Sequence, residues 1–332
     1  MEVRSFGRSG VRLSLLGFGC GAVGGLMVRG EAAEQERAVA RALDAGVNYF
    51  DTAVQYGDGE SEKNLGRALK RLGASDVAVG TKVRVRAEER AEIGAAVARS
   101  LEGSLKRLGR ERADIYHLHN PITEAGGDGS LGVAEVLGEV VPAFERLRSA
   151  GKTRFIGITA VGETEALRKV IEARCFESAQ VVYNMLNPSA GAALPSSYPA
   201  QDYGRLLERT AAAGVGVIGI RVLAGGALSG RAERHPVASP PPAPIGSAMS
   251  YETDLARARR LAPIVAEGFA ESLAEAAIRF VISHDGIGTI LVGMATVEEF
   301  EGALAAVRKG KLSAEALDRL AALQQDFSGE AR

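Results

Sequence analysis

Short apolar segments alternate with amphipathic segments along this chain, and this alternation limits the possible folds more than any other feature. The apolar segments have the length of buried strands, and the amphipathic segments repeat apolar residues with helical periodicity. Strands are expected at residues 15–19, 47–50, 77–83, 115–118, 155–158, 180–183, 215–220 and 289–292. Helices are expected at residues 31–45, 61–72, 91–108, 131–150, 163–173, 203–213, 272–283, 297–307 and 313–325. This order of strands and helices predicts an α/β fold, a (β/α)8 TIM barrel.

The glycine-rich segment 17–25 bears on the main alternative, a doubly wound open sheet. A sheet of that kind that binds a dinucleotide carries Gly-x-Gly-x-x-Gly at the start of a helix, with an acidic residue about twenty positions later. The glycines of segment 17–25 do not keep this spacing, and no helix is expected directly after them. The barrel is therefore favoured over the open sheet.

Three further segments complete the expected architecture. Residues 5–13 have the pattern of a β-hairpin before the first strand, and the helix at 313–325 is additional to the repeated units. A long loop or insert at 223–269 follows the seventh strand. It contains the proline-rich run 240–244, which we expect to be a surface loop rather than a lid. We expect residues 1–332 to form a single domain.

The charge balance and the cysteine content narrow the partners and the compartment. The chain has 40 basic and 41 acidic residues and a formal net charge of −1, which argues against nucleic acid or an anionic membrane as a partner. No apolar run is long enough to span a membrane, and the N-terminus does not have the pattern of a signal peptide. With only two cysteines, Cys20 and Cys175, we expect a cytoplasmic protein in which neither thiol has a role. No pattern indicates the oligomeric state.

Titratable side chains follow three successive expected strands. Asp51 and Tyr56 come after the second strand, Lys82 ends the third, and His119 ends the fourth. Taken alone, each has a plain structural interpretation, such as a surface lysine or a hydrogen-bonded core histidine. Because the carboxyl ends of barrel strands lie together and carry the active site, the three strand ends together predict one site. His117 shares the strand face of His119 and is expected to pack below that site.

The residues at these strand ends resemble those of the aldo-keto reductases. The resemblance rests on Phe50-Asp51-Thr52-Ala53-x-x-Tyr56-Gly57 with Ser61-Glu62, on Thr81-Lys82, and on Asp114-Ile115-Tyr116-His117-Leu118-His119. It extends to the opening hairpin and to segments 151–157, 223–230 and 292–293, and so spans nearly the whole chain. It implies an oxidoreductase that transfers a hydride, without a metal, between a nicotinamide cofactor and an aldehyde, a ketone or a sugar lactol. The implied catalytic tetrad is Asp51, Tyr56, Lys82 and His119.

Each tetrad residue has a chemical role under this resemblance. Tyr56 would act as the general acid and base at the substrate oxygen, although an unperturbed phenol has a pKa of about 10. A nearby Lys82 ammonium is expected to lower that pKa by roughly 1 to 3 units, and Asp51 would keep the ammonium protonated and oriented. His119 would donate to, or orient, the substrate carbonyl.

The resemblance also implies a set of cofactor contacts, some of which depart from the family pattern. Thr159-Ala160 stands in place of the usual Ser-Asn pair at the nicotinamide carboxamide, and Ile220 in place of the aromatic ring that stacks on the nicotinamide. Arg221 is expected either to reach the pyrophosphate or to form a salt bridge at the end of the barrel. The expected cofactor-binding residues are Gly19, Thr159, Gln180, Ile220, Arg221, Leu223, Gly225, Gly293, Ala295 and Glu299.

The turn after the eighth strand bears on the choice between NAD(H) and NADP(H). Family members that prefer NADP(H) hold its extra phosphate with Lys or Arg in this turn, whereas segment 293–299 has no basic residue. Glu299 would repel a phosphate and accept a hydrogen bond from a ribose hydroxyl. Gly302-Ala303 also replaces a common Glu-Asn pair at the adenine, and Arg308 and Lys309 lie further along the helix. We therefore expect NAD(H) to be used at least as well as NADP(H).

The substrate pocket is expected to be less aromatic than is usual in the family. Asn120 follows His119 where relatives often have Trp, and the chain contains no Trp. Phe18, Met27, Val54, Asn120 and parts of the insert are the expected lining, and they favour a lactol sugar or a small polar aldehyde. Two other functions stay open, namely a barrel lyase that forms a Schiff base through Lys82 and a non-catalytic regulatory protein that binds the cofactor.

Overall fold

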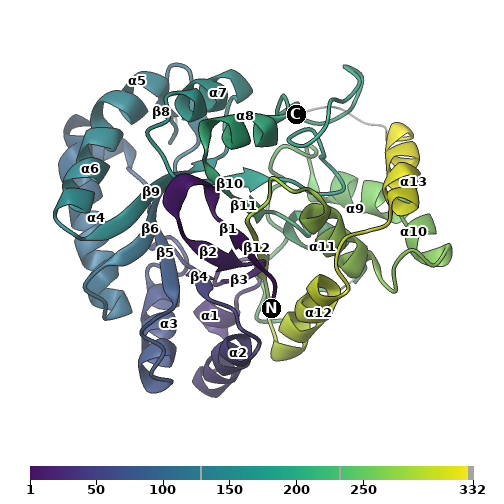
Figure 1. The fold of residues 1–332 in the computed structure, drawn as a ribbon, viewed down its shortest axis with the longest axis horizontal. Helices are drawn as coiled ribbons and strands as arrows, with labels where there is room; N and C mark the ends of the chain where they lie inside the picture. Colours follow the sequence, from purple (N-terminus) through teal and green to yellow (C-terminus); the bar gives the residue numbers. More distant parts are fainter. Residues whose placement is uncertain (128, 232, 328–332) are drawn as a thin grey trace.

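A closed barrel of parallel strands forms the centre of the molecule (Figure 1). The computed structural model describes residues 1–127, 129–231 and 233–327, and within these ranges eight strands close the barrel in the order β3-β4-β5-β6-β9-β10-β11-β12. The strands are β3 Leu16–Gly19, β4 Tyr49–Asp51, β5 Ala78–Val83, β6 Ala113–Leu118, β9 Thr153–Ala160, β10 Ser178–Val182, β11 Gly216–Ile220 and β12 Thr289–Gly293. The predicted (β/α)8 barrel is confirmed, and the open sheet is excluded because β12 pairs with β3.

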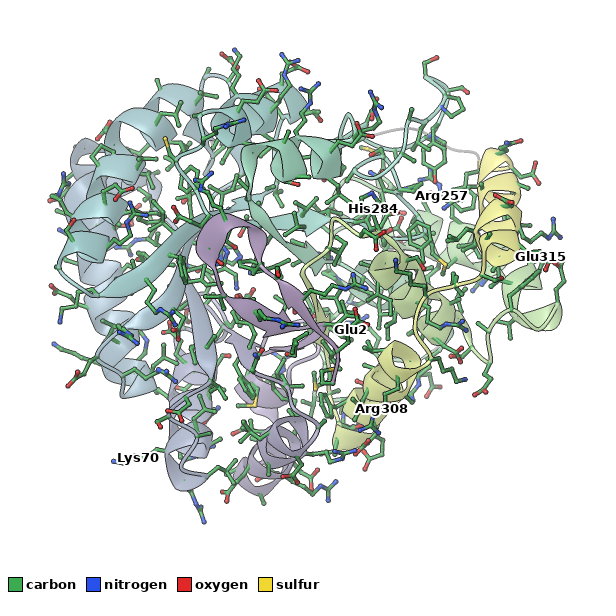
Figure 2. All side chains as sticks on the ribbon, viewed as in Figure 1. Glu2, Lys70, Arg257, His284, Arg308 and Glu315 are labelled. Carbon is green, nitrogen blue, oxygen red and sulfur yellow. The ribbon has the colours of Figure 1, made fainter. Side chains whose placement is uncertain are left out.

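Amphipathic helices cover the outside of the barrel (Figure 1). They pack apolar faces against the strands, while charged side chains such as Lys70 and Glu315 project outward (Figure 2). The helices that follow the strands are α2 Ala32–Asp44, α3 Glu60–Arg71, α4 Ile93–Leu108, α6 Val141–Ser149, α7 Thr164–Glu172, α8 Leu206–Ala213, α11 Leu273–Ser283 and α12 Val297–Arg308, and α13 Ala314–Gln325 is the expected additional helix. In the described part of the chain, no helix combines the length and hydropathy that a membrane crossing requires.

The N-terminal hairpin covers one end of the barrel. Its strands β1 Val3–Ser5 and β2 Arg12–Ser14 pair in antiparallel fashion, as predicted. Phe6, in the turn between them, is 1% exposed and packs with Tyr49, Ile115 and Ile218 from three barrel strands. A Cβ at Gly216 would lie 2.7 Å from the Phe6 ring, so this position requires glycine. The predicted site at the carboxyl ends of the strands therefore belongs to the opposite, open end of the barrel.

Two of the expected helices are wrong in their boundaries. The expected helix at 131–150 begins as strand β8 Leu131–Gly132, which pairs with β7 Ile122–Thr123. It continues through the short helix α5 Val133–Glu135 and a π-helical turn at Val136–Val140 before α6. The expected helix at 203–213 begins only at Leu206, because Arg205 has a left-handed backbone with φ +53°.

The insert at 223–269 is not a long loop throughout. It contains 3-10 turns at Ala224–Ser229, helix α9 Tyr251–Arg260 and the short helix α10 Pro263–Ala266. Its irregular part is hydrogen-bonded to the loop after β3, since the Ser239 amide donates to the Val23 carbonyl at 3.0 Å. The Arg29 guanidinium also donates to the Val237 carbonyl at 2.7 Å. The insert therefore crosses from β11 to the loop after β3, and we call this insert the strap.

The hairpin's role in closing the barrel gives a stability prediction. We expect Phe6→Ala to lower the free energy of unfolding by about 3–5 kcal/mol, because it removes a buried ring from the end of the core. Arg12→Ala, on the exposed side of the same hairpin, is the matched control and should change stability by less than about 0.5 kcal/mol. Urea denaturation followed by circular dichroism measures both, and equal losses in the two variants would contradict the structural role of Phe6.

Candidate active site

A cavity of about 1070 Å³ opens at the carboxyl ends of the barrel strands. Three members of the predicted tetrad, Asp51, Tyr56 and His119, lie in its wall. Residues from the first loop, the insert and α12 also line it, so the cavity runs from the catalytic strand ends outward between β12 and the strap. In the described part of the chain, no group of His, Cys, Asp and Glu side chains could hold a metal ion.

Lys82 and Asp51 form a buried ion pair at the base of the cavity. The Lys82 ammonium donates to Asp51, to the Thr52 carbonyl at 2.8 Å and to the Tyr56 hydroxyl at 3.2 Å, which uses all of its donors. Burial alone would lower the pKa of Lys82, but the carboxylate of Asp51 and the phenol of Tyr56 together outweigh burial and raise it. Lys82 is therefore held as an ammonium beside the phenol.

The second carboxylate oxygen of Asp51 accepts two further hydrogen bonds. The Tyr49 hydroxyl and the Gln180 amide each donate to it at 2.8 Å. Tyr49 lies on the same strand as Asp51, whereas Gln180 reaches it from β10 across the barrel. The sequence interpretation assigned Gln180 to the cofactor alone and gave Tyr49 no role, so this connection was missed.

The expected pKa of Tyr56 is wrong in its net direction. Burial of the phenol is the largest effect and raises the pKa above its ordinary value, while Lys82 opposes it only in part. The proton therefore stays on the hydroxyl at neutral pH. In this state Tyr56 is a proton donor whose conjugate base would be stabilised by the adjacent ammonium.

His119 lies beside Tyr56 as a neutral imidazole. The two ring centroids are 5.8 Å apart with an interplanar angle of 86°. Burial lowers the pKa of His119 to about 3, and the positive charges of Lys82 and Arg84 contribute further. Its Nδ1 lies 3.1 Å from Oε1 of Gln55. The Gln55 group that faces Nδ1 sets the tautomer of His119. An amide oxygen accepts from a protonated Nδ1, whereas an amide NH2 donates to an unprotonated Nδ1 and leaves the proton on Nε2.

His117 occupies the position predicted for it. It is fully buried, and its Nε2 lies 2.9 Å from the Ser178 hydroxyl, so it packs below the cavity rather than in its wall.

Polar atoms on two neighbouring strands fit the carboxamide of a nicotinamide. Thr159 and Gln180 are register partners on β9 and β10, and both line the cavity. The Thr159 hydroxyl is buried and has no hydrogen-bond partner among the described residues. An orphaned buried hydroxyl beside an amide is a site that a polar ligand group would satisfy.

The segment after β11 fits a close approach of phosphate groups. Ile220, Arg221, Leu223 and Gly225 all line the cavity. Gly225 has a left-handed backbone with φ +69°, and a Cβ there would lie 2.7 Å from the Pro242 ring. This backbone can therefore follow its path only with glycine. Within the described residues Arg221 forms no salt bridge, although the Asp254 carboxylate acts on its pKa from a greater distance, and its contact with a pyrophosphate stays a prediction.

Glu299 is held by a contact that sequence reasoning missed. Its carboxylate accepts from the Ala295 amide at 2.8 Å, while its own amide donates to the Thr296 hydroxyl at 3.3 Å, which together cap helix α12. Arg231, which belongs to the insert, forms an ion pair with it at 3.2 Å. The two residues lie 68 positions apart in the sequence, so no local sequence pattern predicts this ion pair.

Lys309 lines the cavity, although the sequence placed it too far along the helix after β12 to contact a cofactor. It lies in the wall of the cavity and pairs with Glu271 at 2.6 Å and with Glu275 at 2.8 Å. Arg308 is not part of the wall.

Three of the residues expected to line the substrate pocket are instead buried in the protein. Phe18 packs between the rings of Phe50 and Phe300, because strand alternation turns its side chain outward from the barrel. Met27 is 1% exposed within the core. The Asn120 amide bonds to the backbone of Val85 and to the Gly129 carbonyl, and so joins two loops.

Other side chains form the wall near the catalytic residues. Val54 is half-buried and lies outside the wall. Residues near Tyr56 and His119 that do line the cavity include Arg84, Pro121, Val161 and Ile245. Pro241 of the proline-rich run is also in the wall, so this run is more than a surface loop.

The chain is similar to known proteins over nearly its whole length. The model of the Aldo/keto reductase family matches residues 15–325. L-galactose dehydrogenase of Arabidopsis thaliana is 31% identical over 316 residues, which cover 92% of this chain and 88% of the plant protein. A probable voltage-gated potassium channel subunit beta of Oryza sativa subsp. japonica is 34% identical over 126 residues, 36% of this chain and 38% of that protein. The holo form of aldo-keto reductase AKR11C1 from Bacillus halodurans has a TM-score of 0.71 and 25% identity, covering 97% of this chain and 96% of its own.

The environment of His119 gives a spectroscopic prediction. With its pKa lowered to about 3, His119 should stay neutral from about pH 5 to 8, and its ¹⁵N shifts should not titrate in that range. Gln55→Glu should place the proton on Nδ1, because a carboxylate only accepts, whereas Gln55→Ala leaves the tautomer free. The ¹⁵N resonances that are missing from the spectrum of His119→Asn are those of His119. A titration of His119 with a midpoint near about 6.5 would contradict the buried, neutral state.

Proposed function

The chain belongs to the aldo/keto reductase family, whose members are nicotinamide-dependent oxidoreductases, and we propose that it acts on a sugar lactol or a small polar aldehyde with a preference for NAD(H). The observation that carries this proposal is the hydrogen-bonded chain from Asp51 through Lys82 to Tyr56, beside a neutral His119. This chain ends in the wall of a cavity large enough for a cofactor and a substrate together.

The cofactor residues in the proposal follow the length of the cavity. Thr159, Gln180 and Ile220 would hold the nicotinamide end, which supplies or accepts the hydride when bound. The loop that contains Leu223 and Gly225 would hold the pyrophosphate through its backbone amides. The adenosine end would lie among Gly19, Gly293, Ala295 and Glu299.

The tetrad residues perform the proton transfer. In reduction, Tyr56 donates its hydroxyl proton to the substrate oxygen as negative charge develops there. Lys82 stabilises the resulting phenolate, and Asp51 keeps the ammonium charged and oriented. His119 can approach the same oxygen without a charge of its own. In oxidation of a lactol, the anomeric O–H would give its proton to Tyr56 in the phenolate form that Lys82 stabilises, and C1 would lose its hydride, which the nicotinamide takes up when bound, so that a lactone remains.

The charges at the outer end of the cavity support the preference for NAD(H). Arg231 is paired with Glu299, and Lys309 is paired with Glu271 and Glu275. The basic side chains there are therefore already neutralised, and carboxylates are in excess. A 2′-phosphate would meet no free cation among these residues, whereas a ribose hydroxyl can donate to a carboxylate.

The sugar substrate in the proposal is supported by similarity and by the wall of the cavity. The Arabidopsis thaliana protein that matches over 92% of this chain is named for its action on L-galactose. Among the described residues that line the cavity, Tyr56 and Tyr251 are the only tyrosines and no Phe is present. A polar, hydroxyl-bearing substrate suits this surface better than a polycyclic one.

The geometry of Lys82 disfavours the Schiff-base lyase. A nucleophilic amine must be free of its proton and accessible. Lys82 is 0% exposed, has an ion-pair partner and has a raised pKa. The regulatory alternative predicts cofactor binding without turnover.

A tyrosine variant tests catalysis against regulation. We expect wild-type protein to oxidise sugar lactols or reduce small aldehydes, and Tyr56→Phe to lower kcat by about 10²- to 10⁴-fold, because the proton donor is lost. Fluorescence titration should show that Tyr56→Phe keeps the cofactor affinity, since the ring remains. Tight NADH binding by the wild type with no turnover over a broad panel of aldehydes and sugars would favour the regulatory protein.

A glutamate variant tests the cofactor preference. We expect kcat/KM with NAD⁺ to exceed that with NADP⁺ by about tenfold or more. Glu299→Gln should improve kcat/KM for NADP⁺ by about 5- to 30-fold, because it releases Arg231 to pair with the phosphate. Glu301→Gln, on the same helix but outside the cavity wall, is the control. A wild-type preference for NADPH would refute this part of the proposal.

A further inference from the structure

The cations in the cavity wall fall into two groups by their partners. Arg231 and Lys309 form ion pairs, and Arg234 donates to the backbone of Gly225 and Ser239. Two other cavity arginines, Arg84 and Arg221, form no ion pair and donate no hydrogen bond within the described residues. These two arginines act electrostatically on the predicted catalytic residues, since Arg84 lowers the pKa of His119 and Tyr56 acts on the pKa of Arg221.

Arg221 is held in place by its backbone rather than by its side chain. It follows β11 with a left-handed backbone at φ +57°, a conformation that costs a non-glycine residue of the order of 1 kcal/mol. Its carbonyl accepts from the Asn184 amide at 3.0 Å. Burial lowers the pKa of the guanidinium, and the nearby phenol of Tyr56 partly offsets this effect. The position is thus fixed, and among the described residues no carboxylate lies within ion-pair distance of the guanidinium, although the Asp254 carboxylate acts on it from further away.

A second pocket adjoins the cavity at Arg221. It has a volume of about 520 Å³ and shares Pro121, Val161, Arg221 and Ile245 with the wall of the main cavity. Arg221 therefore lies at the junction of the two spaces, within reach of a ligand that extends past His119.

Arg84 approaches the same region from another strand. It follows β5 two residues after Lys82, so strand alternation directs both side chains to the cavity side. It is exposed at the mouth of the cavity, and its positive charge is one of those that disfavour protonation of His119. Arg84 and Arg221 thus place positive charge around the catalytic end, whereas carboxylates are in excess at the adenosine end.

We propose that the substrate carries an anionic group, a carboxylate or a phosphate ester, which Arg84 and Arg221 bind while the reacting carbon lies at Tyr56 and His119. The half-buried Arg221 has no ion pair among the described residues, although charges removed from water are normally paired, and the planar guanidinium of either arginine suits both of these anions. The substrate class is therefore a sugar acid, a sugar phosphate or a short oxo acid. This inference rests on the proposed oxidoreductase function.

Matched substrates and matched variants test the proposal. D-galactose, D-galacturonate and D-galactose 6-phosphate differ only at C6 and are assayed as lactols with NAD⁺, and butanal and 4-oxobutanoate are assayed with NADH. The kinetics are measured for wild type, Arg84→Gln, Arg221→Gln and the control Arg86→Gln. Arg86 is exposed, pairs with Glu88 and Glu89, and lies outside the cavity wall.

We expect an anionic substrate to exceed its neutral counterpart in kcat/KM by about tenfold or more in the wild type. Arg84→Gln and Arg221→Gln should each remove most of this preference, with the KM of the cofactor unchanged, whereas Arg86→Gln should keep it. Comparing kcat/KM for D-galacturonate and D-galactose 6-phosphate shows whether the site prefers a carboxylate or a phosphate ester.

Other results would overturn the proposal. Equal kcat/KM for anionic and neutral substrates in the wild type would do so, as would a preference that survives both arginine variants. A raised KM for the cofactor in Arg221→Gln, with the preference intact, would assign Arg221 to the pyrophosphate instead. Turnover of neutral substrates would leave the oxidoreductase function standing in these cases, whereas no turnover of any substrate by the wild type would remove both proposals.

Discussion

The buried ion pair between Asp51 and Lys82 is the interaction on which the rest of the site depends. The two side chains are 4% and 0% exposed, and removing such charges from water costs several kcal/mol per ion unless their remaining polar atoms are satisfied. Thr52 and Tyr56 satisfy the ammonium, and Tyr49 and Gln180 satisfy the carboxylate. Because Gln180 comes from β10, the hydrogen-bonding capacity of the Asp51 carboxylate is satisfied only when the barrel is closed. The hydrogen-bonded chain from Asp51 to Tyr56 therefore depends on the closed barrel, and the pair fixes the geometry at Tyr56 rather than adding stability.

One end of the barrel is filled by the N-terminal hairpin, and the other end is open. The hairpin fills one end with Phe6, whose ring packs on residues from three strands. The other end stays open, and its wall is built from loops and from the insert. The insert contributes through its contacts with the loop after β3, including the bonds from Ser239 and Arg29. A rigid barrel thus supplies the reacting groups, while the connecting segments supply the surface that selects ligands.

The cavity has an electrostatic gradient along its length. At the catalytic end, the charges of Lys82 and Arg84 act with burial to keep His119 neutral. At the other end, Arg231 and Lys309 are matched by carboxylates from α12 and the start of α11. Burial also dominates the phenol of Tyr56, whose pKa rises although an ammonium lies 3.2 Å away. Desolvation therefore sets the protonation states of Tyr56 and His119, whereas the charge of Asp51 and the phenol of Tyr56 set that of Lys82.

The sequence by itself determined the barrel and the strand ends that carry the predicted tetrad. Hydrophobic periodicity is a local property, and barrel topology brings the ends of successive strands together, so Asp51, Lys82 and His119 could be placed in one site from their positions at those ends. Only the tertiary structure decided that Phe18 and Asn120 are buried, since the twist of a strand and the path of a loop determine which way a side chain faces. It also decided the pairing of Arg231 with Glu299 and the net direction of the Tyr56 pKa. These depend on contacts between distant segments and on the depth of burial, neither of which is encoded in the spacing of residues along the chain.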